Sequence, residues 1–392
     1  MIILKQKSDC CGCEVCMHVC PQKCITLKED IEGYKYPYID KESCIDCNLC
    51  SKRCPLINSY ESRFPLKIMA AKSTNKNTQI KSWSGGIFSE LATLVLQKNG
   101  IVFGVKFDTG WEVVHSYIDN IDDLWQFQTS KYVQSNIADS YQRAKEFLEQ
   151  NRIVLFSGTP CQIAGLKRFL NREYDHLYCV DFVCHGVPSP KVWQQYLAAI
   201  CNKQNIKFSS IQNINFRDKT EGWNSFSFSI KYFNSKKENK VFREPLYKNL
   251  YLQSFIANIT LRPSCYSCAF KRYKSMSDIT MGDYWGIEKE HPNFKDNNGI
   301  SLMSILTDKG LNIYRQLHIS DIESSYDKVK TLNSAIECPC SEPSCRTAFM
   351  DKLDSENILS LMSSYLKTPF RLKVHYMLIP LIKRLKTVLD KN

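Results

Sequence analysis

Two cysteine runs with identical spacing lie in the first sixty residues. The cysteines of each run are separated by two, two and three residues: Cys10, Cys13, Cys16 and Cys20 in the first, and Cys44, Cys47, Cys50 and Cys54 in the second. A proline follows each run directly, as Pro21 and Pro55. No other feature constrains the fold as much, because the chain between the runs must be arranged around eight thiols.

This spacing is that of bacterial ferredoxins, in which the first three cysteines of a run bind one cubane cluster and the fourth binds the other. The sequence therefore predicts two 4Fe-4S clusters. The expected ligands of the first are Cys10, Cys13, Cys16 and Cys54, and those of the second are Cys44, Cys47, Cys50 and Cys20. Zinc is an alternative, but it takes four ligands, usually from two separated CxxC pairs. A disulfide framework is another, but it requires export, and the first residues show no export signal.

Composition indicates a soluble globular protein of two or more domains, with 392 residues, 43% hydrophobic and 23% charged. Nineteen cysteines without an export signal predict a reducing compartment, and hence a cytoplasmic protein. No apolar run approaches the length of a membrane-spanning helix. The net charge of +12 is concentrated in residues 366–392, and no basic stripe interleaved with aromatic residues appears elsewhere, so nucleic-acid binding is not expected.

From Ile68 the pattern alternates between short apolar strands and amphipathic helices, which predicts an α/β domain with a mainly parallel sheet. Antiparallel strands are expected at 214–219, 226–233 and 240–245, followed by a turn-rich segment at 277–289. The predicted fold class is an N-terminal α+β dicluster ferredoxin-like domain followed by a mixed α/β domain. The predicted boundaries are 1–60 for the dicluster domain, 61–67 for a linker, 68–350 for the α/β domain and 351–392 for a helical basic tail.

Four further cysteines stand at predicted element ends. Cys161 begins a helix, Cys184 ends a strand, and Cys265 and Cys268 form a CxxC pair. Their spacing alone leaves zinc or plain packing open. Two glycine-bearing turns, 84–86 and 157–160, each precede a helix, where free amides attract anions. Neither turn is a GxGxxG fingerprint.

The order of the segments SGGIFSELA, SKYVQS, LFSGTPCQIAGLKRFL, DFVCHGVPSP, FRDKTEGW, LRPSCYSCAFK and DITMGDYWGI resembles the coenzyme F-420 hydrogenase/dehydrogenase beta-subunit family. The resemblance extends from Cys10 to about Phe349 and implies an iron–sulfur flavoprotein with FAD in the α/β domain. It implies a third 4Fe-4S cluster on Cys161, Cys184, Cys265 and Cys268. It also implies FAD contacts at Ser84, Gly85, Gly86, Ser130, Lys131, Tyr132, Gly158 and Thr159.

The expected function is that of an oxidoreductase that passes electrons between the clusters and FAD, and a hydride between FAD and a cofactor or small substrate. A deazaflavin or a substrate of polysaccharide synthesis would be the hydride donor or acceptor, and a ferredoxin or another oxidoreductase subunit the redox partner. The alternative is a non-catalytic electron-transfer subunit of a larger complex. A binding module that has lost its cofactors is a third alternative, against which the intact cysteine sets argue. His185 is the candidate proton donor, although a histidine bonded to the backbone is the simpler interpretation.

Cysteines outside these motifs are expected to be buried free thiols, namely Cys11, Cys24, Cys179 and Cys201. Loop cysteines are expected at Cys338, Cys340 and Cys345, which lack a fourth ligand for a metal. In the tail, residues 374–389 carry apolar side chains at helical period. Such a helix would lie on an anionic membrane surface, dock on a partner, or pack on its own domain.

Overall fold

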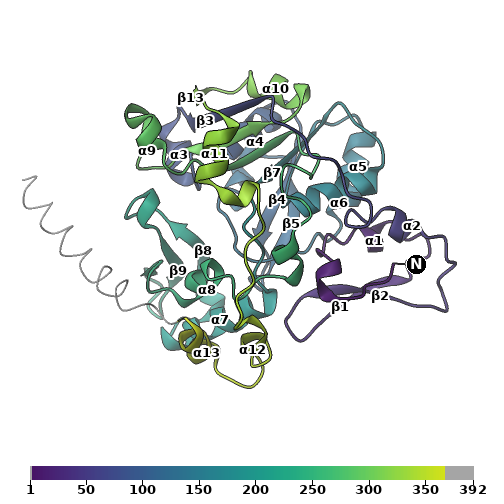
Figure 1. Ribbon diagram of the computed structural model, residues 1–392. Helices are drawn as coiled ribbons and strands as arrows, with labels where there is room; N and C mark the ends of the chain where they lie inside the picture. Colours follow the sequence, from purple (N-terminus) through teal and green to yellow (C-terminus); the bar gives the residue numbers. More distant parts are fainter. Residues whose placement is uncertain (1, 367–392) are drawn as a thin grey trace, which may run out of the picture.

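The computed structural model describes residues 2–366, which form an N-terminal lobe and a larger α/β body (Figure 1). The lobe contains the hairpin of β1 (Ile25–Glu29) and β2 (Lys35–Ile39) and the short helices α1 (Val15–His18) and α2 (Leu49–Lys52). Both cysteine runs lie in this lobe. Residues 59–66, which lead to the body, contain no helix or strand.

The body is built on a sheet that has eight strands in the described chain, in the order β13-β3-β12-β11-β7-β6-β4-β5. The strands are β3 (Lys67–Ser73), β4 (Ile101–Phe107), β5 (Val113–Ile118), β6 (Val154–Ser157), β7 (Leu177–Phe182), β11 (Ile279–Asp283), β12 (Ser301–Ile305) and β13 (Ile319–Glu323). The four strands β4, β6, β7 and β11 are parallel, and the other pairings are antiparallel. The expectation of a mixed α/β domain is confirmed.

The expectation of a mainly parallel sheet is wrong. Strand β12 lies between β11 and β3 and runs opposite to both, so one half of the sheet is antiparallel. The segment at 277–289 is also more ordered than expected, because it contains β11 at the centre of the sheet. With only five residues, among them a threonine, a glycine and an aspartate, this strand has the composition of a turn.

Helices cover both faces of this sheet. Alternate strand residues face opposite sides, so Val102 and Leu155 pack under α4, while Phe103 and Phe156 pack under α5 and α6. Because both faces are covered, β4 and β6 read as continuous apolar runs. The helices of this body are α3 (Lys76–Lys81), α4 (Ile87–Gln97), α5 (Ser140–Glu149), α6 (Pro160–Leu170), α9 (Ile287–Glu290), α10 (Asp308–Tyr314) and α11 (Tyr326–Leu332).

A second, antiparallel sheet has the order β10-β9-β8, as expected from the sequence. It packs with four helices around Trp193, which is fully buried. Its strands are β8 (Ile211–Asp218), β9 (Ser227–Phe233) and β10 (Asn239–Pro245), and the helices are α7 (Pro190–Lys203), α8 (Leu250–Ile256), α12 (Arg346–Met350) and α13 (Ile358–Tyr365). The amphipathic tail helix expected beyond residue 366 lies outside the described residues. Within residues 2–366, no helix has the length and apolar character needed to cross a bilayer.

The carboxyl ends of five strands meet at one edge of the large sheet, because β3 runs in the same direction as β4, β6, β7 and β11. Cofactors and ligands of open α/β sheets are bound at such an edge. The loops that follow these strands carry Cys184 and the two glycine turns singled out in the sequence.

Candidate functional site

The two cysteine runs form the same local structure in the lobe. Residues on both sides of the second cysteine are left-handed: Gly12 and Glu14 in the first run, and Asp46 and Asn48 in the second. Glu14 and Asn48 each begin a short helix, α1 and α2, that carries the third cysteine. Because a left-handed residue reverses the chain within one step, the thiols of a run can gather on one side of the loop.

The first cysteine group contains the four thiols that the sequence assigned to one cluster. Burial raises the pKa of Cys16 and of Cys54, and the thiol of Cys10 raises both further. The Cys11 thiol lowers the pKa of Cys13 and burial raises it, with smaller contributions from Cys16 and Cys54. The fourth cysteine of the second run therefore lies beside the first three of the first run.

The second cysteine group lines a pocket with about 350 Å³ of empty space. Its walls include the four expected thiols and a fifth, Cys24, together with Ile25, Ile39, Ile45 and Leu49. The Sγ atoms of Cys20 and Cys24 are 3.4 Å apart. Cys47 is exposed and Ile45 is 60% exposed, so this group lies at the surface of the lobe.

The third cysteine group lies at the carboxyl edge of the large sheet. Cys161 stands in the first turn of α6, Cys184 follows β7, and the CxxC pair lies in a turn at Pro263–Ser267 and just after it. Burial raises the pKa of Cys184, and Cys265 raises it further, with smaller contributions from Cys161 and Cys268. Four cysteines from three separate segments thus converge, as the family resemblance implies.

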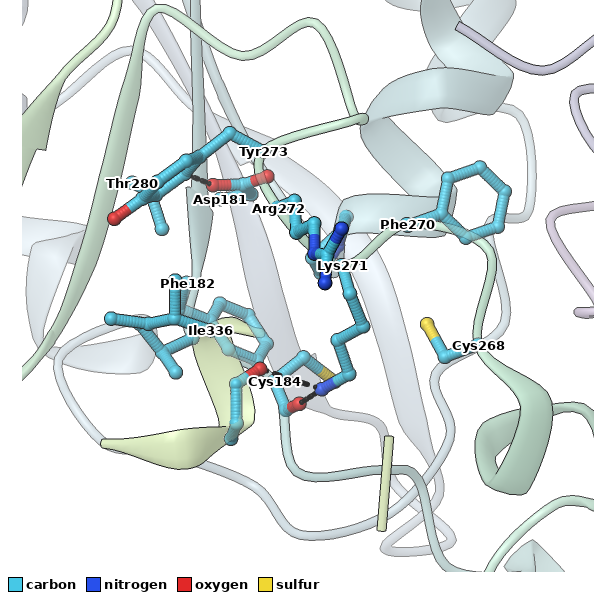
Figure 2. Close-up of a pocket in the computed structure, with 13 residues that line it drawn as sticks. Asp181, Phe182, Cys184, Cys268, Phe270, Lys271, Arg272, Tyr273, Thr280 and Ile336 are labelled. Atoms are coloured by element: carbon cyan, nitrogen blue, oxygen red, sulfur yellow. Dashed lines mark hydrogen bonds between the residues drawn. The ribbon is translucent and has the colours of Figure 1, made fainter. Parts of the chain in front are cut away.

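A pocket with about 330 Å³ of empty space adjoins this third group and is lined by Cys184 and Cys268. Figure 2 shows Lys271 reaching across it to the backbone of Cys184. The Lys271 ammonium donates to the carbonyls of Cys184, at 2.7 Å, and Ala335, at 2.8 Å. Cys340 lies close by, with its Sγ 3.8 Å from the Cys265 carbonyl oxygen. Across the described chain, no three His, Cys, Asp or Glu side chains come close enough to share a single metal ion.

Cys11, to which the sequence motifs assign no role, joins the first and third groups. It is buried, the Cys13 thiol raises its pKa and the Cys161 thiol lowers it, so it lies against both. Gly165 in α6 permits this approach, because a Cβ there would lie 3.1 Å from Cys13 Cβ and 2.6 Å from the Tyr141 hydroxyl. That hydroxyl donates to the Cys13 carbonyl at 3.0 Å.

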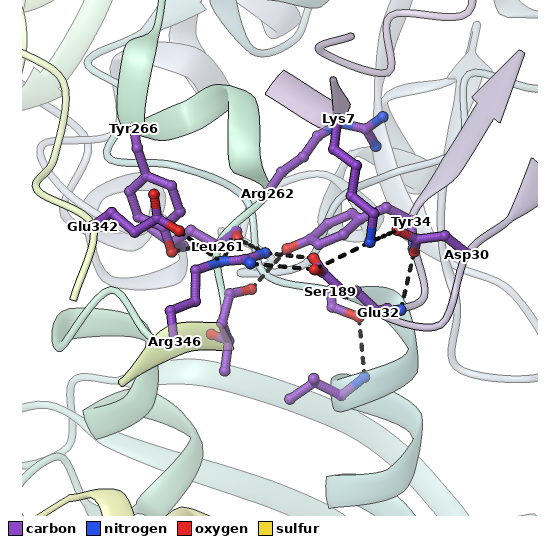
Figure 3. A network of polar contacts seen from close by, with 12 residues as sticks. Lys7, Asp30, Glu32, Tyr34, Ser189, Leu261, Arg262, Tyr266, Glu342 and Arg346 are labelled. Atoms are coloured by element: carbon purple, nitrogen blue, oxygen red, sulfur yellow. Dashed lines mark hydrogen bonds and ion pairs between the residues drawn. The ribbon is translucent and has the colours of Figure 1, made fainter. Parts of the chain in front are cut away.

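A buried polar network fixes the lobe on the body (Figure 3). Glu32, in the β1–β2 turn, forms a bidentate ion pair with Arg346 of α12, and both side chains are at most 10% exposed. The Tyr34 hydroxyl donates to the carbonyl of Thr260 at 2.7 Å. Gly33 has φ +84°, and a Cβ there would lie 2.1 Å from Lys191 Cβ. The lobe and its clusters of thiols therefore have one position relative to the third group.

The first glycine turn is packed into the sheet edge. The Ser84 hydroxyl donates to the carbonyl of Ile300 at 2.9 Å, and the Gly85 amide donates to Ser301 Oγ at 3.0 Å. A Cβ on Gly85 would lie 2.3 Å from the Ala71 carbonyl oxygen. Gly86 is left-handed and begins α4. The Ser84 side chain and the Gly85 amide thus already have partners, and the first turn of α4 is what remains for an anion.

Lys131 and Tyr132 lie on the same side of the body, whereas Ser130 precedes them without a described contact. The Lys131 ammonium donates to the carbonyls of Gln126 and Thr129, each at 2.9 Å, and burial lowers its pKa to about 7. The ring of Tyr132 stacks on Phe255 with 4.5 Å between centroids.

The second glycine turn borders the third cysteine group. The Gly158 amide donates to the Val180 carbonyl. The amide and hydroxyl of Thr159 both donate to Gln162 Oε1, at 3.0 and 2.9 Å, and Thr159 Oγ1 lies 3.0 Å from Cys161 Sγ. This turn and the one at Ser84 lie at β6 and β12, three strand spacings or roughly 14 Å apart.

Arg217 connects the residues near the first turn with Tyr132. Its guanidinium centre lies 3.3 Å from the ring centre of Trp83 and 4.3 Å from that of Phe226, and it lowers the pKa of the Tyr132 hydroxyl, which burial raises to about 12. It pairs with Asp283 at the end of β11, at 2.7 Å. Arg217 Nε and Asp283 Oδ1 are buried and have no hydrogen-bond partner among residues 2–366. The sequence showed both residues within its motifs, but only the fold places them together.

His185 follows Cys184 and is held by a side chain. Its Nε2 lies 2.6 Å from Asn258 Oδ1, and its ring packs edge-on against Phe255. Burial lowers its pKa and Asn258 raises it. The neutral ring is therefore the favoured form, with a fixed orientation beside the third group.

Comparison with known proteins identifies two parts of the chain. Residues 151–326 match the family described as the C terminus of the coenzyme F420 hydrogenase/dehydrogenase beta subunit. Residues 9–56 match the 4Fe-4S dicluster domain. A solved structure, the F420-reducing NiFe hydrogenase complex from Methanosarcina barkeri, is similar with a TM-score of 0.47 and 16% identity, covering 71% of this chain and 90% of that chain.

Three curated relatives are similar to different lengths of the chain. A coenzyme F420-dependent sulfite reductase of Methanocaldococcus jannaschii is 26% identical over 213 residues, which cover 52% of this chain and 32% of that protein. An uncharacterised ferredoxin of the same organism is 30% identical over 79 residues, 20% of this chain and 95% of that ferredoxin. An NADH-quinone oxidoreductase subunit I 2 of Geobacter metallireducens is 44% identical over 55 residues, 13% of this chain and 42% of that protein. The chain thus belongs to the coenzyme F420 hydrogenase/dehydrogenase beta-subunit family and carries a 4Fe-4S dicluster ferredoxin domain at residues 9–56.

Proposed function

We propose that this chain is an iron–sulfur flavoprotein oxidoreductase that relays electrons from the lobe surface to a flavin in the α/β body. The observation that carries the proposal is the continuous series of cysteine groups. It begins at exposed Cys47, passes through the buried first group, and reaches Cys161 by way of Cys11. A series of thiols that leads from solvent to the carboxyl edge of the sheet is suited to electron transfer.

The cysteines would hold three 4Fe-4S clusters. The donor sets fit, because each group offers four thiols and a cubane takes four thiolates. The first cluster would take Cys10, Cys13, Cys16 and Cys54, the second Cys44, Cys47, Cys50 and Cys20, and the third Cys161, Cys184, Cys265 and Cys268. Lys271 would place a positive charge beside the third cluster, since its ammonium lies on the Cys184 carbonyl.

FAD would lie along the carboxyl edge between the two glycine turns. The fit rests on Arg217 and Asp283, whose buried Nε–H and Oδ1 are a donor and an acceptor without a partner in residues 2–366. Trp83 and Tyr132 offer aromatic surface beside them. A planar heterocycle with hydrogen-bonding edges matches such a setting better than an apolar ligand does.

The predicted contacts would share this task. Ser84, Gly85 and Gly86 would bring the N-terminus of α4 to a phosphate. Ser130, Lys131 and Tyr132 would line the middle of the site, and Gly158 and Thr159 would approach the end next to the third cluster. The domains predicted for residues 1–60 and 68–350 would then correspond to electron entry and to flavin chemistry.

Clusters exchange single electrons, and a bound flavin exchanges single electrons or a hydride, which no side chain can supply. The chain's residues would position and shield these groups. His185, oriented by Asn258, would hold a proton at the ring nitrogen that faces away from that amide. Arg217 would supply a fixed positive charge, since its pair with Asp283 is largely closed to solvent.

The proposed hydride donor or acceptor is a deazaflavin or a small substrate, including a substrate of polysaccharide synthesis, and the redox partner is a ferredoxin or another oxidoreductase subunit. A deazaflavin is supported by the printed name of the sulfite reductase relative, which is coenzyme F420-dependent. The same relative favours a second function, because the matched region is 32% of a longer protein. In that case the chain would relay electrons to the active site of another subunit.

The test begins with iron and flavin content of protein purified without oxygen. We expect about twelve irons and one FAD per chain, and about eight irons in Cys161→Ser. Cys201→Ser, which removes a thiol outside all three groups, is the control and should keep the wild-type iron content. About eight irons in the wild type, or an unchanged content in Cys161→Ser, would contradict the third cluster. Turnover of a deazaflavin with a reduced viologen by the isolated chain separates the enzyme from the relay subunit.

A further inference from the structure

Arg262 lies at the contact between the lobe and the body and is 1% exposed. Its Nε donates to the Cys10 carbonyl at 2.8 Å, one terminal nitrogen donates to Gln134 Oε1 at 2.9 Å, and the other donates to the Lys35 carbonyl at 2.9 Å. That second nitrogen also lies 3.6 Å from Cys10 Sγ. The guanidinium is thus fixed with one N–H group directed at a thiol of the first cysteine group.

All of these acceptors except the thiol are neutral. Among the described residues, Arg262 forms no ion pair with a carboxylate, and Tyr34 and Tyr36 lie under its face at 5.2 and 4.4 Å. A buried cation without a counter-charge is strongly destabilising. Burial lowers the pKa of Arg262, and Cys10 and Tyr36 raise it. The site therefore requires negative charge from the direction of Cys10.

A four-iron cluster with four thiolate ligands supplies that charge, because it is an anion that gains one more negative charge on reduction. Burial of such a cluster opposes reduction, since the added charge is less well solvated. A fixed positive charge and an N–H directed at a ligand sulfur act in the opposite direction, and both set the potentials of such clusters. The second group has a different environment, with Cys44 Sγ 3.9 Å from the Asp46 carboxylate.

We propose that Arg262 is the counter-charge of the first cluster and raises its reduction potential, so that this buried cluster accepts an electron from the exposed second cluster. The proposal rests on the ligand assignment given under the proposed function. Arg262 also lowers the pKa of Cys161, which Cys11 and burial raise, so its charge reaches the third group. It is a tuning residue and touches no substrate.

The experiment is a redox titration of the whole chain without oxygen, in which the cluster signals are followed by electron paramagnetic resonance. Arg262→Gln and Arg262→Met remove the charge at similar side-chain length, and Arg262→Lys keeps it. Arg168→Gln is the matched control. Its guanidinium also joins the body to the N-terminal segment, donating to the Asn58 carbonyl and lying 4.1 Å from the Tyr60 ring, but it contacts no cysteine.

In both neutral variants we expect the equilibrium constant for one-electron reduction of one cluster to fall at least tenfold, which is 59 mV. Arg262→Lys should recover most of this loss, and Arg168→Gln should titrate as the wild type. Unchanged potentials in a neutral variant with wild-type iron overturn the proposal, and so does a loss of iron common to all three Arg262 variants. Iron loss from the neutral variants alone supports it, because the charge is then what the site requires. A wild type with fewer than about eight irons would instead refute the ligand assignment itself.

Discussion

Replacing Arg346 with methionine would test how firmly the lobe is held on the body. The substitution removes both hydrogen bonds to the Glu32 carboxylate and both to the Leu261 carbonyl. The two charged side chains are 4% and 10% exposed, so the pair is buried. Methionine occupies a similar length without charge, so the change isolates the lost polar contacts.

The magnitude follows from what remains unpaired. Removing one partner of a buried ion pair costs about 3–5 kcal/mol. Glu32 keeps a second cation, because Lys7 Nζ lies 3.2 Å from its Oε1, and this places the cost near the lower limit. The Leu261 carbonyl, which loses its charged donor, adds a further contribution of about 1 kcal/mol. We expect a loss of about 3–4 kcal/mol in the free energy of unfolding.

The assay is urea unfolding without oxygen, followed by tryptophan fluorescence, with hydrogen exchange of residues 30–36 as a local measure. The double variant Glu32→Gln with Arg346→Met should lose only about 1–2 kcal/mol, since no buried charge is then left without its partner. Asp354→Asn breaks the nearby but more exposed pair with Lys191 and should cost less than about 1 kcal/mol. If the two single losses simply add in the double variant, the pair is not coupled and the reasoning fails.

Three further predictions follow from the candidate site. Arg217→Met should lower the flavin content at least tenfold with little change in iron; flavin retained at the wild-type level would contradict the FAD placement. His115 is buried and its pKa is lowered to about 4, so the unfolded chain binds a proton that the folded chain does not between pH 6.5 and 4. Stability should therefore fall by roughly 3 kcal/mol as the pH decreases through this window, and urea unfolding of His115→Gln should lack that part of the slope. Cys54→Ser should lose about four irons and Cys24→Ser none; equal losses would show that Cys24, which lines the same pocket as Cys20, is a ligand.

Repeats and continuous apolar runs could be interpreted from the sequence because they depend on local order. The spacing of the two cysteine runs predicted the dicluster domain, and the family match at residues 9–56 confirms it. The buried strands β4 and β6 were predicted because both faces of each are covered, which makes their sequences apolar throughout. Strand β11 was missed, since five residues with alternating polarity carry too little pattern.

Side chains whose role depends on tertiary contact could not be predicted in the same way. Arg262 and Cys11 have no periodicity or spacing that marks them, and their positions follow from how the lobe meets the body. Arg217 and Asp283 stand 66 residues apart in the chain and meet only because β8 and β11 end near each other. For Ser84 and Gly85 the sequence identified the turn but not its packing, in which both already bond to the residues around Ser301.

The insertion of the β1–β2 turn into the body has a consequence for kinetics. Two separate proteins must diffuse together before an electron can pass, and the rate then depends on concentration and on ionic strength. Glu32, Gly33 and Tyr34 hold the lobe in one position through contacts closed to solvent, so transfer from the first to the third cysteine group requires no such encounter. Salt should slow only the step at the exposed second group, where an external donor must first collide with the lobe.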